Sequence, residues 1–338
     1  MRERLERDWY NPRLTLLTAA LLPASWLFRI TSALRRTLYR GGLLARTPPG
    51  IPVIVVGNVT LGGTGKTPLV IWLVQALRER GWHPGIISRG YGGADATVRE
   101  VAPDADPAQA GDEPVLLARS GAPVWIGADR NAAARGLLAA HPQTDVLVSD
   151  DGLQHYALAR AIEIVVIDGA RGFGNGALLP AGPLREPVAR INAADAVVVN
   201  GGEAVVRSFA GTPPPIFAMR LTGERLVNLA EPSRSIGAAA LRGKRVHALA
   251  GIGNPARFFV ALRALGLDPV CHPFPDHHRY SADELRLTEA DAIVMTDKDA
   301  IKCHRIADAR MWRLPVAAEV EPGLIELILE KLHGRQAA

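Results

Sequence analysis

A glycine-rich segment, TLGGTGKT, carries the residue types that bind phosphate, and it follows the apolar run at residues 53–56. Glycines allow backbone N–H groups to close around an anion, Lys66 can reach the terminal phosphates of a nucleotide, and the Thr67 hydroxyl can ligate Mg²⁺. The usual pattern G-x-x-x-x-G-K-[ST] has a glycine where this chain has Thr60, and an ordinary glycine-rich turn is the alternative. An expected strand before the segment and an expected helix after it favour a phosphate-binding loop for a nucleotide triphosphate with Mg²⁺. The loop comprises Thr60, Leu61, Gly62, Gly63, Thr64, Gly65, Lys66 and Thr67.

Two adjacent carboxylates, Asp150 and Asp151, follow the apolar run at residues 145–148. The carboxyl ends of parallel strands share one edge of a sheet, and ligands bind there. We therefore expect this pair beside the phosphate loop, where it suits Mg²⁺, an ion that takes oxygen ligands and usually one or two carboxylates from protein. A turn in which Asp150 caps a helix is the alternative.

Asp112 and Glu113 precede a proline that opens an apolar helical segment. Acidic residues stabilise a helix amino terminus through its dipole, so Asp112 is explained as a cap. The functional alternative is a general base for a hydroxyl nucleophile.

The connection at residues 169–187 is rich in glycine and proline and longer than most loops of a compact domain, which is typical of functional loops. Arg185 is suited to stabilising charge on a transferring phosphoryl group, and Glu186 to holding Mg²⁺. A solvated ion pair is the alternative for both residues.

Two adjacent histidines, His277 and His278, follow an expected strand near residue 271. Neighbouring histidines point in different directions and are a poor metal clamp compared with i, i+4 spacing. One of them is better suited to act as a base, or to orient a base, across a cleft. The motif at residues 296–299 (TDKD) ends another strand of the second domain, and a surface turn is its default interpretation. The alternative is that this motif faces the cleft too.

Strand-like apolar runs alternate with helical patterns from residue 53 to residue 199, which predicts an α/β fold with a parallel sheet covered on both faces. A proline-rich connector and two short extended runs, 216–221 and 225–229, predict a β-hairpin hinge. A second strand and helix series follows from Arg245. The expected divisions are an amino-terminal helical segment at 1–45, a P-loop domain at 46–212, a hinge at 213–232 and a smaller α/β domain at 233–338.

Charge and hydropathy are unevenly distributed at the amino terminus. The first 50 residues hold nine arginines and three acidic residues, a net charge of +6 against +5 for the whole chain. Beside them lies a run without charge at residues 14–28, which is shorter than the roughly 20 residues of a membrane span and contains Pro23. We expect an interfacial helix on an anionic membrane surface, with Trp9, Tyr10 and Trp26 as anchors, and no binding of nucleic acid. A buried core helix is the alternative.

The motifs occur together in an order that resembles the tetraacyldisaccharide 4′-kinase family of lipid A biosynthesis. They are GNVTLGGTGKTP, SRGYGG, GDEP, DDGLQH, LPAGPLREP, FPDHHRY and TDKDAIK, and the resemblance runs from about Arg13 to about Lys302. The resemblance implies transfer of the γ-phosphate of ATP to the 4′-hydroxyl of a tetraacylated glucosamine disaccharide 1-phosphate. It also implies a peripheral or monotopic location at the cytoplasmic face of the inner membrane.

Roles for particular residues follow from the same resemblance. It implies that residues 60–67 cradle ATP, with Thr60 usual for the family, and that Asp112 acts as base toward the sugar hydroxyl, paired with His277. Asp150, Asp151 and Glu186 would organise Mg²⁺, and Arg185 would steady the γ-phosphoryl group.

Three other function classes compete with a lipid kinase. A membrane-bound ATPase of the deviant Walker type has a lysine at the start of its loop, where this chain has Leu61. A non-catalytic nucleotide-binding adaptor at the membrane has no need of DDGLQH, LREP and FPDHHRY together. A soluble kinase for a small metabolite is disfavoured by the basic and apolar amino terminus.

Overall fold

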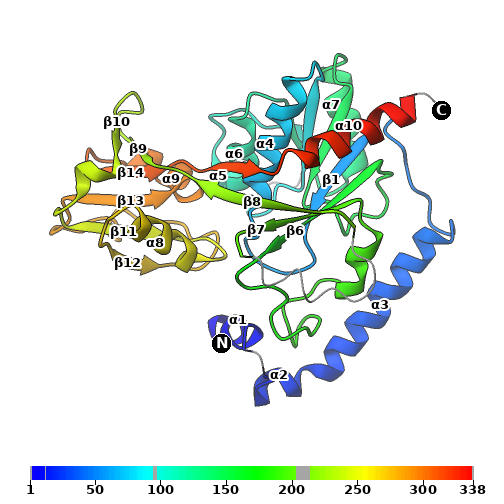
Figure 1. Ribbon diagram of the computed structural model, residues 1–338, viewed down its shortest axis with the longest axis horizontal. Helices are drawn as coiled ribbons and strands as arrows, with labels where there is room; N and C mark the ends of the chain where they lie inside the picture. Colours follow the sequence, from blue (N-terminus) through cyan, green and yellow to red (C-terminus); the bar gives the residue numbers. More distant parts are fainter. Residues whose placement is uncertain (1, 12, 94–96, 203–213, 337–338) are drawn as a thin grey trace.

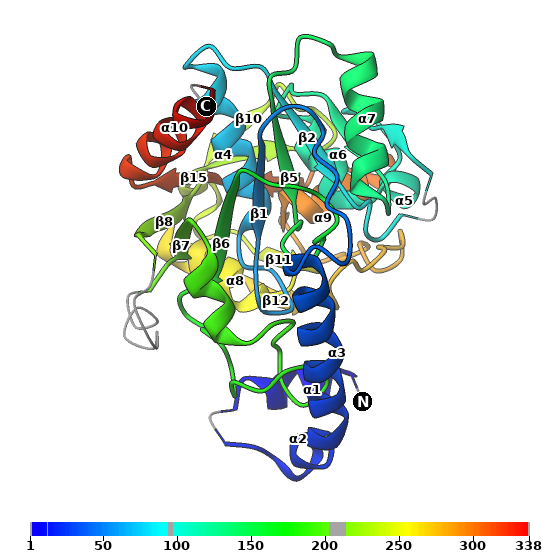
Figure 2. The same cartoon turned by 90° about the vertical axis from the view of Figure 1, so that its right-hand side faces the viewer.

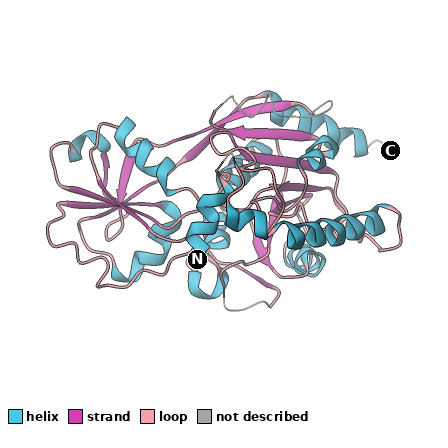
Figure 3. Cartoon of the chain, turned by 90° about the horizontal axis from the view of Figure 1, so that it is seen from below, coloured by secondary structure: helices cyan, strands magenta, loops and turns pink. Residues whose placement is uncertain are grey.

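The chain forms two β-sheets, each packed with helices, and a helical arm at the amino terminus (Figure 1). The computed structural model describes residues 2–11, 13–93, 97–202 and 214–336. The two sheet-containing lobes lie side by side along the long axis of the molecule, as Figure 3 shows from below. The arm lies against the larger lobe.

The larger sheet has nine strands in the order β15-β8-β7-β6-β1-β5-β2-β4-β3. All neighbouring strands are parallel except β3 and β15, which pair antiparallel at the two edges. The strands are β1 (Val53–Gly57), β2 (Pro84–Ser88), β3 (Arg99–Glu100), β4 (Val124–Ile126), β5 (Val146–Asp150), β6 (Ile162–Asp168), β7 (Ala196–Asn200), β8 (Ile216–Thr222) and β15 (Ala317–Val320). The predicted parallel sheet is confirmed.

Helices cover both faces of this sheet, which explains why its central strands are apolar throughout rather than alternating. In β1, Ile54 and Val56 pack into one core cluster and Val53 and Val55 into the other. The first cluster includes residues of α4 (Lys66–Arg78), α6 (Asp112–Ala118) and α10 (Gly323–Gln336), and the second includes residues of α7 (Arg130–Ala140) and the 3₁₀ helix η1 (Val188–Ala193). The short helix α5 (Pro107–Ala110) precedes α6.

The smaller sheet has six strands in the order β10-β9-β14-β13-β11-β12. Strands β14, β13, β11 and β12 are parallel, so their carboxyl ends lie together. The strands are β9 (Arg225–Asn228), β10 (Ser235–Gly237), β11 (Val246–Ala250), β12 (Val270–Pro273), β13 (Ala292–Thr296) and β14 (Met311–Leu314). The helical elements are α8 (Pro255–Ala264), α9 (Asp297–Cys303), η3 (Ala238–Leu241) and η4 (His304–Ile306).

Two strand connections join the lobes, and they correct the predicted hairpin. The runs at 216–222 and 225–228 form strands, but β8 belongs to the larger sheet and β9 to the smaller one. Near the end of the chain β14 and β15 cross in the opposite direction, and β15 pairs antiparallel with β8. The predicted hairpin is therefore wrong. The antiparallel partner of β8 is β15, which lies about a hundred residues later in the chain, and a pairing over this distance leaves no signal in the local sequence. The expected boundary at 212/213 lies outside the described residues.

The same crossing corrects the extent of the smaller domain. Residues 233–338 were expected to form it, yet β15 joins the edge of the larger sheet and α10 packs there. Leu324, Ile325, Ile328 and Leu332 of α10 are buried in the core cluster that contains α4. The chain thus returns to the larger lobe for its last strand and helix.

The amino-terminal arm consists of α1 (Arg2–Trp9), α2 (Leu16–Ala20) and α3 (Leu22–Arg40), and Figure 2 shows α3 extending away from the sheets. Pro23 lies in the first turn of α3 and does not interrupt it. Large apolar side chains of the arm face solvent, among them Leu16 (93% exposed) and Trp26 (65% exposed), so the buried core helix is excluded. Within the described ranges, every helix is too short or too polar to cross a membrane.

Two of the predicted interfacial anchors have other contacts. Trp9 is buried, and its Nε1 donates a hydrogen bond to the Pro180 carbonyl at 2.9 Å. The Tyr10 hydroxyl donates to the Leu61 carbonyl at 3.3 Å. Their role as anchors is therefore wrong, because they fasten α1 to the larger lobe. Trp26 is exposed, and its role as an anchor stays a prediction.

Candidate active site

The glycine-rich loop connects β1 to α4 at the carboxyl edge of the larger sheet. Gly65 precedes Lys66, the first residue of α4, with a φ of 95°, a conformation that favours glycine. Side chains around the loop hold it in place: Asn58 Nδ2 donates to the Thr60 carbonyl at 2.8 Å, and Lys66 Nζ donates to Asn58 Oδ1 at 3.2 Å. The amino-terminal amides of α4 and the Lys66 ammonium therefore serve one anion-binding position.

Asp151 lies at the end of β5, the neighbour of β1, and contacts two cations of the site. Arg185 Nη1 donates to its two carboxylate oxygens at 2.8 and 3.0 Å, and Lys66 Nζ is 3.5 Å from Oδ1. Burial would raise the pKa of the Asp151 carboxyl, but the charges of Lys66 and Arg185 hold it well below its usual range. Asp151 is in the left-handed region with a φ of 48°, a strained backbone of the kind found at functional sites.

Asp150 differs from its neighbour because its Oδ1 is buried without a hydrogen-bond partner among the described residues. Burial, and next the negative charge of Glu113, raise the pKa of the Asp150 carboxyl to about 7. A buried carboxylate oxygen of this kind fits a divalent cation, which would supply the missing partner and favour the ionised form.

The other predicted metal ligands have different surroundings. Thr67 lines the same cavity as Asp150, whereas Glu186 accepts hydrogen bonds from Tyr156 and, at 3.0 Å, from Gln154 Nε2. The described residues contain no cluster of three or more His, Cys, Asp or Glu side chains suited to a metal. Mg²⁺ usually takes only one or two carboxylates and completes its shell with phosphates and water, so the residues present fit it.

Asp112 and His277 meet across the two lobes. Asp112 begins α6 of the larger lobe, and His277 lies in the turn after β12 of the smaller lobe. His277 Nδ1 is 3.0 and 3.1 Å from the two carboxylate oxygens of Asp112. His277 has a φ of 63°, so the turn holds the ring toward Asp112 in a strained conformation.

The hydrogen bond shifts the protonation of both partners. Burial would raise the pKa of the Asp112 carboxyl, but the hydrogen bond from His277 and the charge of Lys298 lower it below its usual value. Burial would lower the pKa of the His277 imidazole, but the hydrogen bond to Asp112 raises it above its usual value. The contact therefore favours a protonated ring beside an ionised carboxylate.

Lys298 is a site residue to which the sequence assigned no role: a surface turn is the default interpretation of the motif at 296–299, and a place at the cleft is the alternative. Its Nζ is 3.0 Å from both Glu113 Oε1 and Asp276 Oδ1, and 4.0 Å from Asp112 Oδ2. Burial would lower the pKa of this ammonium, but the carboxylates of Glu113 and Asp112 raise it above its usual value. Lys298 of α9 thus fastens the smaller lobe to α6 beside the Asp112–His277 pair.

A second bridge between the lobes lies at the phosphate loop. Asp168, at the end of β6, accepts hydrogen bonds from Arg171 Nε at 3.0 Å and from Arg257 Nη2, on α8, at 2.6 Å. Arg171 in turn donates to the carbonyls of Gly63 at 2.8 Å and Gly253 at 2.7 Å. No sequence motif marked this bridge, because Arg257 lies 89 positions from Asp168 in the chain.

These groups surround one cavity of about 1360 Å³ between the lobes. Lys66, Asp150, Asp151, Arg185 and Glu186 line it from the larger lobe, His277 and Lys298 line it from the smaller lobe, and Phe28, Ser32 and Arg35 line it from α3. The structure therefore brings most of the predicted site residues to one cleft. Thr60 is buried and does not line it, and Asp112 joins it through its contact with His277. Helix α3 of the arm therefore forms part of the wall of the same cleft.

Comparison with known proteins finds a matching family and similar proteins. Residues 17–333 match the family LpxK, described as Tetraacyldisaccharide-1-P 4′-kinase. Two proteins named Tetraacyldisaccharide 4′-kinase are similar: one from Azoarcus sp. (strain BH72), 53% identical over 94% of this chain and 93% of its own, and one from Methylobacillus flagellatus, 50% identical over 97% and 95%. A crystal structure described as "apo" form LpxK from Aquifex aeolicus in complex with ATP matches with a TM-score of 0.78 and 30% identity, over 94% of this chain and 100% of that one.

Proposed function

The chain belongs to the tetraacyldisaccharide-1-P 4′-kinase family, and from this premise we infer how its cleft carries out the transfer. It is an ATP-dependent kinase of lipid A biosynthesis that phosphorylates the 4′-hydroxyl of a tetraacylated glucosamine disaccharide 1-phosphate. One observation carries the assignment of roles: Lys66 and His277, the partner of Asp112, line the same cavity from opposite lobes. A nucleotide held at Lys66 thus faces the histidine of the other lobe that contacts the base, Asp112.

Asp112 is the group that removes the proton of the attacking hydroxyl. Its carboxylate is ionised at neutral pH because its pKa lies below the usual value. As the sugar oxygen bonds to the γ-phosphorus, the proton passes to the carboxylate and the bond to the β-γ bridging oxygen breaks, releasing ADP. His277 orients the carboxylate through the hydrogen bond at its Nδ1, and Lys298 holds the turn that carries His277.

The remaining cations of the cleft act on the phosphates. In a loose phosphoryl-transfer transition state little covalent work is needed, so positioning and charge stabilisation supply most of the rate. Lys66 and the loop amides hold the β- and γ-phosphates, and Arg185, held by Asp151, points its charge at the same place. Mg²⁺, when bound, neutralises phosphate charge, and Asp150 with Thr67 would hold it.

The two strand connections form the hinge of this enzyme. Only residues 223–224 separate β8 from β9, and only residues 315–316 separate β14 from β15. The contacts of Lys298 with Glu113 and of Asp168 with Arg257 close the lobes at two points. Closure excludes water from the γ-phosphate and limits wasteful hydrolysis.

The arm places the cleft at a membrane surface. Along α3 the exposed apolar residues Trp26, Ile30 and Leu34 recur every fourth position and form one stripe, while Ser32 and Arg35 line the cleft. A helix with this pattern lies in the interfacial plane, so the acyl chains stay in the bilayer while the sugar enters the cleft. Since ATP is a cytoplasmic substrate, we place the protein at the cytoplasmic face of the inner membrane as a peripheral or monotopic enzyme.

The proposal is tested by incubating the protein with γ-labelled ATP and the disaccharide lipid. We expect label in the lipid that depends on Asp112 and on Mg²⁺. Label released only as inorganic phosphate would overturn the kinase assignment and favour an ATPase of the deviant Walker type. Leu61 stands where that class has its first lysine, so we expect little hydrolysis without lipid.

A further inference from the structure

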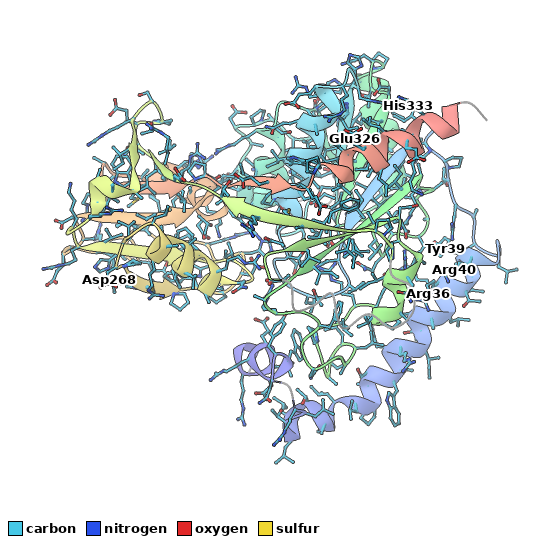
Figure 4. The ribbon with its side chains drawn as sticks, viewed as in Figure 1. Arg36, Tyr39, Arg40, Asp268, Glu326 and His333 are labelled. Atoms are coloured by element: carbon cyan, nitrogen blue, oxygen red, sulfur yellow. The ribbon has the colours of Figure 1, made fainter. Side chains whose placement is uncertain are left out.

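A second, smaller pocket of about 210 Å³ lies between the end of α3 and η1, apart from the cleft. Three arginines line it: Arg36 and Arg40 from α3 and Arg190 from η1. Figure 4 shows Arg36 and Arg40 at the end of α3 beside the green segment that follows β6. None of the roles assigned above uses this pocket.

Arg190 is a buried arginine in the wall of this pocket. The residue is only 4% exposed, and its Nη1 is buried without a hydrogen-bond partner among the described residues. Its Nη2 donates to Glu163 Oε2 at 2.6 Å, and its Nε is 3.4 Å from Glu186 Oε2. The guanidinium therefore bonds one carboxylate and lies beside a second, while its Nε and Nη1 make no hydrogen bond with the described residues.

The charge around the pocket is positive after these carboxylates are counted. Glu163 also pairs with Arg160, at 3.0 Å, and Arg36 Nη1 is 3.9 Å from Glu186. Arg40 has no hydrogen-bond or ion-pair partner in the described part of the chain. Four arginines thus surround two carboxylates, which leaves two positive charges for an anion.

The position of the pocket indicates where that anion comes from. With 3.6 residues per turn, Arg36 and Arg40 fall on the flank of α3 next to Trp26, and Arg35, which lines the cleft, falls on the other flank. When the apolar stripe of α3 lies in the acyl region, the pocket faces the layer of lipid phosphates. Guanidinium groups bind phosphate oxygens with two parallel hydrogen bonds.

We propose that this pocket binds the phosphate of an anionic phospholipid and so fixes the orientation of the arm on the bilayer. The inference rests on the membrane placement proposed above and adds to it a specific phosphate site. This proposal differs from nonspecific attraction of a basic surface to the bilayer, because such attraction requires only the charge of each arginine.

Arg29 provides a matched control, because it is an exposed arginine on the same flank of α3 and lies outside both pockets. Binding is measured by sedimentation with phosphatidylcholine vesicles, with and without phosphatidylglycerol. Arg29→Gln should weaken binding to the anionic vesicles about fivefold, the loss expected of one surface charge. Arg40→Gln should weaken it about fiftyfold, because it also removes hydrogen bonds to a phosphate.

A charge-conserving pair separates recognition from attraction. Arg40→Lys keeps the cation near the carboxyl end of α3 but loses the planar fork, so we expect about a tenfold loss, whereas Arg29→Lys should bind like the wild type. Equal losses in Arg29→Gln and Arg40→Gln, or full binding by Arg40→Lys, would overturn the phosphate site.

Two further comparisons are needed. One distinguishes a lipid phosphate from a free anion, and the other distinguishes failure of this inference from failure of the proposed function. Inorganic phosphate without vesicles, compared with chloride at equal ionic strength, should shift the Tm of the wild type and of Arg40→Gln equally, because binding at the phosphate loop is common to both. A rise in Tm that Arg40→Gln abolishes would assign the pocket to a free anion and overturn the lipid source. If the wild type phosphorylates the lipid but the arginine variants behave alike, only this inference fails. If it transfers no phosphate, the proposed function fails, whatever the vesicles show.

Discussion

The pairing of Asp112 with His277 makes a quantitative prediction about catalysis. Asp112→Asn keeps the shape of the side chain and removes the base, so kcat should fall by about 10²- to 10⁴-fold. His277→Asn removes the group that orients the base. Its hydrogen bond, with Nδ1 3.0 Å from Asp112 Oδ1, joins a half-buried ring to a buried carboxylate. Such charge-assisted bonds contribute about 1.5–3 kcal/mol, so we expect a loss of about 10- to 150-fold.

The double variant tests whether the two residues act together. In the Asp112→Asn background the carboxylate that His277 orients is gone, so His277→Asn should cost little more. The matched control is His278→Asn, since His278 is adjacent but pairs with Glu284 at 3.0 Å and lies outside the cavity. Its kcat should stay within a few-fold of the wild type.

The assay is transfer of labelled phosphate from ATP to the lipid acceptor at saturating substrates, with circular dichroism to show that each variant is folded. Near-normal turnover in either single variant would refute the role of this pair. Fully additive losses in the double variant would show that the two side chains act independently.

The pH dependence follows from the same hydrogen bond. Activity should fall at low pH as Asp112 is protonated below its usual range, and at high pH as His277 loses its proton above its usual range.

The free energy of unfolding should depend on pH through the same two groups. The contribution of His277 is complete below its unfolded pKa and disappears as pH rises through the raised folded value; that of Asp112 is complete above its unfolded pKa and disappears as pH falls through the lowered one. In Asp112→Asn, NMR titration should find a lower pKa for His277.

Four other changes test the remaining parts of the cleft. Lys66→Ala should lower phosphate transfer by orders of magnitude in a protein whose circular dichroism is unchanged, because it removes a transition-state contact. Asp150→Asn should raise the Mg²⁺ concentration needed for half-maximal rate; an unchanged Mg²⁺ titration would contradict its role. In Gly253→Ala the new Cβ would overlap the Gly63 amide of the phosphate loop, so kcat should fall if closure is required. Trp26→Ser should raise the KM for the lipid more than the KM for ATP. A KM for the lipid equal to that of the wild type would argue against membrane placement.

Much of the fold was predictable because local patterns carry it. Continuous apolar runs such as Val53–Gly57 predict strands buried on both faces, and the change from strand to glycine loop to helix predicts the position of Lys66. The parallel order of those strands then predicts that Asp150 and Asp151 lie beside the loop. These steps use only neighbours in sequence and the rule that the carboxyl ends of parallel strands share an edge.

Local patterns did not predict three features: the pairing of strands at the hinge, the return of the chain end to the larger sheet, and the role of Lys298. Pairing of β8 with β15 joins residues that are about a hundred positions apart, and a short extended run fits a hairpin as well as an edge strand. The motif at 296–299 reads like any turn after a strand. Its lysine acquires a role only because α9 packs against α6 of the other lobe.

The sequence alone determined the chemistry available to this protein: a phosphate loop, paired carboxylates at a strand end, and an apolar arm with excess arginine. Its resemblance to a known family implied the pairing of Asp112 with His277, which spacing did not. The tertiary structure decided which of these groups meet, the two bridges that join the lobes, and the arginine pocket at the end of α3. The physical reason is that residue type and local period are properties of short segments, whereas contacts between distant segments depend on how all the buried surfaces pack at once.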